Sequence, residues 1–309
     1  MNYADLLKDS FWIVLRNRFL WVFGLFAGGG GGSFGIPSGS GGSFPEEGDR
    51  DLPSVGTLVE PARQWAAGHV GQISLLVGFI LLLILLFVAI GALCAGALAE
   101  SVAAIDRGEE RRFGSTFRAG LTVFPRALGL LLVFAALYLL LFLTIGGSML
   151  FLFLASAPGS LSAQMVSIFN ALTLASVLVF VISIPLGIVA QFALREVVVR
   201  GERVFASITN GYRLFRRNLG KGMLLWFVQI VVGLVAGILL VIAMLIVASV
   251  LGVPAVLLLV LAGKSLGIGA LVFAGVVLVA LIIVIAAAIS TFNHTYWTLA
   301  YLRLVQHFS

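Results

Sequence analysis

Few residues in this chain have the type and spacing that catalysis requires. Its three histidines are scattered, without the HExxH spacing of a metal site and without a carboxylate pair nearby: His69, His294 and His307. Carboxylates are paired only at 46–47 and 109–110, in hydrophilic segments where solvation by water is the simpler interpretation. We therefore expect a protein that is not an enzyme and that holds no cofactor or metal ion.

A second set of polar residues lies inside long apolar stretches, where hydrocarbon offers no hydrogen-bond partner. Its members are Asn170, Gln191, Gln229, Asn293 and His294. Hydrogen bonding between helices, worth about 0.6 kcal/mol per bond, is the simpler interpretation. A substrate path beside Asn293 and His294 is the alternative. Every Asp and Glu lies outside these stretches or at their ends, which argues against an ion-coupled carrier.

The elements that carry these residues are predicted to be membrane helices. Hydrophobic residues make up 61% of the chain and charged residues 10%, against roughly a quarter charged in soluble domains. A helix needs about 20 apolar residues to cross the hydrocarbon core. Five longer segments contain no Asp, Glu, Lys or Arg: 19–45, 64–99, 127–194, 222–263 and 265–302. The sequence therefore predicts an all-α integral membrane protein.

Turn residues divide these segments into spans. A Pro-Gly pair at 158–159 splits the longest segment, and Pro254 with Gly263 separates the last two, because Pro fixes φ and Gly accepts turn geometry. The five expected spans are about 73–104, 125–155, 164–196, 220–252 and 267–303.

A sixth, short span is expected at about 19–35. Its strictly apolar part, 19–27, continues into glycines, so a signal peptide is the rival interpretation. Charge favours a retained span, because six spans place all but three of the 19 Lys and Arg residues on one side. Arg50, Arg63 and Lys264 remain for the other side. The positive-inside rule then predicts that both termini are cytoplasmic.

An internal repeat organises the charged segments. Residues 120–129 align without gaps on 211–220, and each copy follows an Arg-Gly-Glu turn. A fainter copy begins the chain, and Ser10, Gly120 and Gly211 occupy the same offset. A 4, 4, 3 apolar stripe, typical of one helix face, runs through Tyr3, Leu7, Phe11 and Val14, through Phe113, Phe117, Leu121 and Phe124, and through Val204, Ile208, Tyr212 and Phe215.

We interpret each copy as an interfacial amphipathic helix followed by a transmembrane hairpin. A single membrane domain, 1–309, then holds repeats at about 1–106, 107–199 and 200–309, the first with a Gly/Ser-rich outer loop at 28–60. Repeats that cannot bury their own faces pack on their neighbours. We therefore expect a six-helix transmembrane bundle, with three amphipathic helices on its cytoplasmic rim.

Basic residues gather in and beside the three interfacial helices. Arginine suits phosphate, because its planar fork binds two oxygens at once, and a basic amphipathic helix lies at the level of the headgroups. The headgroup candidates are Arg16, Arg107, Arg111, Arg112, Arg126, Arg200, Arg203, Arg213, Arg216 and Arg217. We expect anionic membrane lipids as partners, together with a membrane-protein partner, and no nucleic acid.

This pattern resembles a bacterial membrane family, the one named for the membrane domain found beside glycerophosphodiester phosphodiesterases. The resemblance is carried by the three helix-and-hairpin units, the glycine tract after the short span, the Arg-Gly-Glu turns and the terminal Tyr-Trp-Thr-Leu-Ala-Tyr at 296–301. It implies a multi-pass protein of the bacterial cytoplasmic (inner) membrane. The phosphodiesterase activity of that family belongs to a separate soluble barrel domain, so no catalytic residue carries over.

Two functional hypotheses follow from these features. The first is a non-enzymatic membrane protein that organises or senses lipid, or assists membrane complexes, through its basic interfacial helices. The second is a passive permease or channel for a small or apolar solute. The few polar groups inside the spans favour the first hypothesis, because a solute path through the membrane needs a polar lining.

Overall fold

The computed structural model describes residues 2–29, 68–155, 161–261 and 263–306, and its regular structure in these ranges is helical. The helices are α1 (Tyr3–Arg16), α2 (Leu20–Gly29), α4 (Val70–Asp106), α5 (Phe113–Ala155), α6 (Leu161–Arg200), α7 (Val204–Arg217), α8 (Leu219–Leu261) and α9 (Lys264–Gln306). Most of the predicted outer loop 28–60, the Pro-Gly pair at 158–159 and His307 lie outside the described residues.

Five of these helices, α4, α5, α6, α8 and α9, are long and apolar enough to cross a membrane. The chain is therefore a multi-pass membrane protein. Within the described residues, a sixth candidate span exists only if α1 and α2 are counted together, and they are bent by 112°. With 10 residues, α2 is about 15 Å long, half of the hydrocarbon thickness. The remainder of the predicted span 19–35 lies outside the described residues.

Two helix boundaries differ from the sequence-based prediction. The interfacial helix predicted around 113–126 is not separate, because α5 continues through Pro125 into the apolar stretch. Likewise α8 continues through Pro254 instead of ending at 252. Proline is tolerated inside helices in apolar surroundings, where neighbouring helices and local adjustment satisfy the freed backbone groups. The turn between α8 and α9 falls at Gly263, which has φ +96°.

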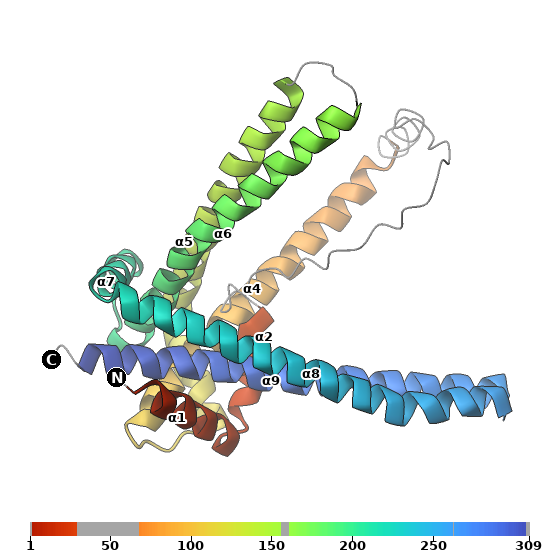
Figure 1. The fold of residues 1–309 in the computed structure, drawn as a ribbon. Helices are drawn as coiled ribbons and strands as arrows, with labels where there is room; N and C mark the ends of the chain where they lie inside the picture. The colour runs from red at the N-terminus through yellow and green to blue at the C-terminus, as the bar shows by residue number, and fades with distance from the viewer. Residues whose placement is uncertain (1, 30–67, 156–160, 262, 307–309) are drawn as a thin grey trace.

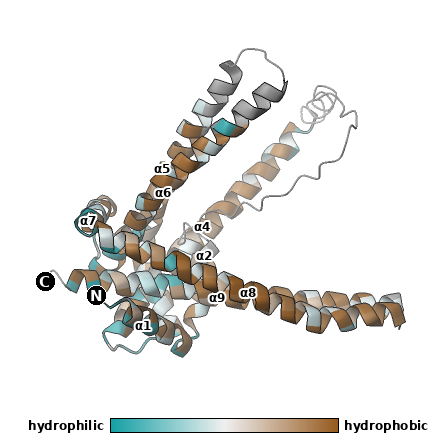
Figure 2. Cartoon of the chain, in the orientation of Figure 1, coloured by the Kyte–Doolittle hydropathy of each residue, from teal (hydrophilic) through white to brown (hydrophobic). Residues whose placement is uncertain are grey.

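One end of the molecule is packed. Most of the buried apolar side chains belong to residues 92–104 of α4, 188–198 of α6 and 296–304 of α9. Side chains of α1, α2 and α7, and of the first parts of α5 and α8, cover this region. We call the region together with these side chains the packed core. Hydrophilic residues gather around this end of the molecule in Figure 2.

Three apolar arms extend from the packed core. They consist of residues 70–90 of α4, residues 135–155 and 161–187 of α5 and α6, and residues 226–261 and 264–286 of α8 and α9. Most large apolar side chains on the arms are exposed, and the arms diverge in Figure 1, with α8 and α9 leading away from the others. In lipid, no hydrophobic force draws such arms together. The six-helix bundle therefore remains a prediction, because the arms pack on one another only near their inner ends in the part of the chain described.

Short amphipathic segments pack on the long helices that precede them. The first part of α5 packs on α4, and α7 packs on α6. At the start of the chain, α1 packs on α9, the last helix. The two ends of the chain therefore lie close together in Figure 1, and an ion pair joins Asp9 of α1 to Arg303 of α9.

Candidate functional site

Arg195 of α6 is the most unusual polar residue of the packed core, because its exposed fraction is 0%. Nη1 of the guanidinium donates to the backbone oxygen of Gln191 at 3.0 Å and also to the Oε1 atom of that residue. Nη2 donates to the backbone oxygen of His294, on α9, at 3.3 Å. All of these acceptors are neutral. Among the described residues, no carboxylate forms an ion pair with Arg195.

His294 lies on the other side of this contact and is also buried, with 1% exposed. Its backbone oxygen accepts a second hydrogen bond, from the hydroxyl of Thr298 at 2.8 Å. Both ring nitrogens are buried and have no hydrogen-bond partner within the described residues. Two of the polar candidates predicted from sequence, Gln191 and His294, are thus brought together around Arg195. We call these three residues the Arg195 cluster.

Two further contacts tie α8 to α9 beside this cluster. The indole nitrogen of Trp297 donates to Oε1 of Gln229 at 2.7 Å, and the hydroxyl of Tyr296 donates to the backbone oxygen of Leu225 at 3.1 Å. The rings of Trp297 and Phe192 pack edge to face, 5.7 Å apart. Gln229 therefore serves as a hydrogen-bond partner between helices.

The remaining in-membrane candidates do not join the Arg195 cluster. Asn170 is exposed on the second arm, 25 positions before Arg195 on the same helix and therefore about 37 Å away. Asn293 precedes His294 and is half-buried, and its Oδ1 atom is buried without a hydrogen-bond partner in the described structure. These positions do not form a continuous polar path along the helices.

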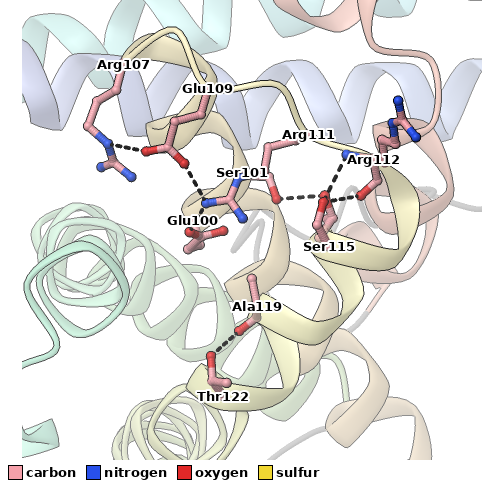
Figure 3. Close-up of polar contacts among 10 residues, drawn as sticks. Glu100, Ser101, Arg107, Glu109, Arg111, Arg112, Ser115, Ala119 and Thr122 are labelled. Atoms are coloured by element: carbon pink, nitrogen blue, oxygen red, sulfur yellow. Dashed lines mark hydrogen bonds and ion pairs between the residues drawn. The ribbon is translucent and has the colours of Figure 1, made fainter.

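An ion-pair network holds the first Arg-Gly-Glu turn, as Figure 3 shows. Gly108 ends α4 with φ +85°, a conformation that favours glycine. Arg107 Nε contacts Glu109 at 3.0 Å, while Arg111 Nη2 contacts Glu109 at 3.0 Å and Glu100 at 2.7 Å. The arginines of this turn are therefore already paired with carboxylates, and a lipid phosphate would have to compete for them.

The second Arg-Gly-Glu turn has the same backbone shape. Gly201 has φ +69° and its oxygen accepts a hydrogen bond from Nη1 of Arg126 at 2.8 Å, across 75 positions of sequence. Arg200 contacts Glu196 at 3.5 Å. The predicted role of glycine as the helix end is confirmed in both turns, and Arg126 and Arg200 each have a protein partner.

The other headgroup candidates are exposed to the surroundings. None of them forms an ion pair within the described residues: Arg16, Arg112, Arg203, Arg213, Arg216 and Arg217. The richest segment is 203–221, which contains no Asp or Glu. Its helix, α7, thus presents basic side chains that the rest of the described protein does not neutralise.

The apolar stripe of α7 does not face the lipid as a simple interfacial helix predicts. Val204, Ile208 and Phe215 pack against the core instead, because Gly211 lets α7 approach α6 closely. Tyr212 and Phe205 remain outside, with 51% and 76% exposed. The aromatic side chains available to a membrane surface are therefore Tyr212 and Phe205.

Reasoning from sequence missed Arg195 as a site residue, because it lies at the end of an uncharged stretch and was grouped with the basic cytoplasmic side. Helical spacing offered one signal. Gln191 and Arg195 are four positions apart, so they share a helix face, and the polar pair faces the packed core. Only the contact between α6 and α9 adds His294 to that face.

A family model described as "Family of unknown function (DUF7544)" matches residues 12–307. No curated protein matches the chain, and no solved structure matches it. The resemblance to the membrane domain found beside glycerophosphodiester phosphodiesterases is not tested by these results and stays a prediction.

Proposed function

Because the chain belongs to DUF7544, a family of unknown function, its role has to be argued from its own residues. We propose that it is a non-enzymatic membrane protein that organises or senses anionic lipid, or assists membrane complexes, through its basic rim. The basic rim consists of the exposed arginines on α1, on α7 and at the start of α5. In this proposal the rim and both termini are cytoplasmic, and the membrane is the bacterial inner membrane.

The observation that carries the proposal is the charge of α7. Arg213, Arg216 and Arg217 are exposed and unpaired within the described residues, and no acidic residue occurs between Arg203 and Lys221. Phosphates of anionic lipids are the complementary groups available at a membrane surface. The exposed rings of Phe205 and Tyr212 precede these arginines on the same helix and suit the headgroup level, where aromatic side chains are enriched.

The proposed repeat gives the rim its arrangement. Gly120 of the first part of α5 and Gly211 of α7 occupy the same offset in the repeat, and each lies against a long helix, beside Ala97 and Ala193. Ser10, at that offset in α1, is fully buried. In all three segments, the small residue at this offset is therefore packed against the rest of the protein. This equivalence supports a three-repeat architecture in which each copy presents its basic residues around the packed core.

Lipid retention by variants of α7 tests the proposal. Replacing Arg213, Arg216 and Arg217 with Gln removes three charges at about 1 kcal/mol each, so binding of anionic lipid should weaken roughly 100-fold at low salt. Native mass spectrometry of the protein extracted from membranes measures the retained lipid.

A matched variant replaces the same three arginines with Lys. It keeps the charge but loses the planar fork, so lipid retention should fall only in part. Unchanged retention of anionic lipid in the Gln variant, with the protein correctly inserted, would contradict the proposal. In that case the arginines serve only to orient the chain during insertion.

A further inference from the structure

The charge of the Arg195 cluster is not balanced by any described residue. The guanidinium is completely buried, and its bonds run to the neutral oxygens of Gln191 and His294. A buried cation without a counter-ion is strongly unfavourable, because neutral acceptors replace only part of the lost hydration. A negatively charged partner is therefore expected on electrostatic grounds.

The nearest carboxylate in the sequence does not supply that partner. Glu196, which follows Arg195, is itself buried and contacts Arg200 at 3.5 Å. The negative end of the α6 dipole does not supply it either, because that effect falls off within the last turn and Arg195 lies five positions before Arg200. The charge of Arg195 thus remains uncompensated by the described protein.

The Arg195 cluster also contains buried polar atoms that have no hydrogen-bond partner in the described structure. The Nε atom of Arg195 and both ring nitrogens of His294 are buried and have no partner within the described structure. Buried polar atoms are nearly always satisfied in folded proteins, by protein groups, water or ions. Arg195 Nε–H and one N–H of the imidazole are therefore donors without an acceptor in the described structure, and an anion is an acceptor for donors of this kind.

We propose that the Arg195 cluster is a binding site for a small monovalent anion, with chloride as its representative. A monovalent anion matches the single unpaired charge of Arg195. A lipid phosphate does not suit this position, because the headgroup is large and the guanidinium has no exposed surface. A doubly charged anion would leave a buried negative charge in place of the positive one. This site is independent of the lipid-binding function proposed above.

Chloride dependence of stability tests the site. The detergent-purified full chain is melted in sodium chloride and in sodium gluconate at equal ionic strength, and binding of radiolabelled chloride is measured on the same samples. A ligand that binds only the folded state raises Tm in a saturable way. We expect such a rise for chloride, of roughly a few degrees, together with about one chloride per chain, as the single guanidinium charge requires.

Two variants locate the effect. Arg195→Gln should abolish both the chloride-dependent shift and the bound chloride, whereas Arg203→Gln, which removes an exposed arginine, should change neither. If Arg195→Gln does not fold, the chloride-dependent Tm and the bound chloride of the unmodified chain still show whether the protein binds chloride. No bound chloride in the unmodified chain overturns the proposal, and so does a chloride effect that persists in a folded Arg195→Gln variant.

Discussion

At the scale of single residues, the buried aromatic residues of α9 differ in whether their polar atoms have hydrogen-bond partners. Tyr296 and Trp297 each place a polar atom on a partner in α8, so their burial carries no unpaired donor. His294 is buried to the same degree, but its ring nitrogens have no partner in the described structure. The His294 ring therefore fills space in the packed core but leaves its two nitrogens without hydrogen bonds in the described structure. The polar ring atoms of Tyr296 and Trp297, in contrast, are hydrogen-bonded.

His294→Ala tests whether this residue is structural. Removing the buried ring leaves a cavity beside Arg195, so we expect a lower Tm, corresponding to about 1–3 kcal/mol. Lipid retention should be unchanged, because the basic rim is untouched. The control is Asn170→Ala, an exposed polar residue of the second arm, which should leave Tm unchanged. Loss of lipid retention at normal Tm in His294→Ala would instead indicate a functional path.

At the scale of helices, glycine sets how closely the short amphipathic segments approach the long ones. A Cβ added to Gly120 would lie 2.7 Å from Cβ of Ala97, and one added to Gly211 would lie 2.9 Å from the backbone nitrogen of Ala193. The second contact is with backbone, which cannot rotate away. The crossing of α7 over α6 therefore depends on the absence of a side chain at Gly211.

Gly211→Val should destabilise the crossing of α7 over α6. Overpacking of this kind costs about 1–3 kcal/mol, so we expect a lower Tm and easier proteolysis of the segment around α7. Gly220→Ala is the matched control, because a Cβ there meets nothing within 4 Å and alanine favours a helix. It should leave Tm equal or slightly higher. Equal Tm values for Gly211→Val and the unmodified chain would contradict the close crossing.

At the scale of the whole molecule, the packed core and the arms have different surroundings. Among the described residues, the basic residues other than Lys264 lie at and beside the packed core, whereas the arms carry long runs of exposed apolar side chains. Such runs suit hydrocarbon, where they need no protein partner. We therefore expect the packed core to lie at one face of the membrane, and the charge distribution predicts that this face is cytoplasmic.

Cysteine labelling tests that orientation. With Cys94 replaced by Ser, a membrane-impermeant thiol reagent added outside intact cells should label Ser40→Cys and should not label Ser309→Cys. Both positions lie outside the described residues. Permeabilised cells provide the control, in which both positions should react. Labelling of position 309 alone in intact cells would reverse the topology.

The sequence by itself determined the class of the protein and the location of its long helices. Uncharged stretches longer than the bilayer requires leave few alternatives to a membrane helix, so the expected spans 73–104, 164–196 and 267–303 agree with α4, α6 and α9 to within four residues at each end. The expected spans 125–155 and 220–252 fall within longer helices, because α5 begins 12 residues earlier and α8 ends nine residues later. Proline was less informative. Pro125 and Pro254 are turn signals in water, but both lie inside helices here, because neighbouring helices and local adjustment satisfy the freed backbone groups.

Only the tertiary structure decided which distant residues meet. Arg195 appeared to be one more basic residue of the cytoplasmic side until the contact between α6 and α9 placed it against His294, 99 positions away. The packing of α1 on α9 likewise joins the two ends of the chain. Periodicity reports the face that a helix buries, but not the helix against which it is buried, because that choice depends on shape and close approach between distant segments.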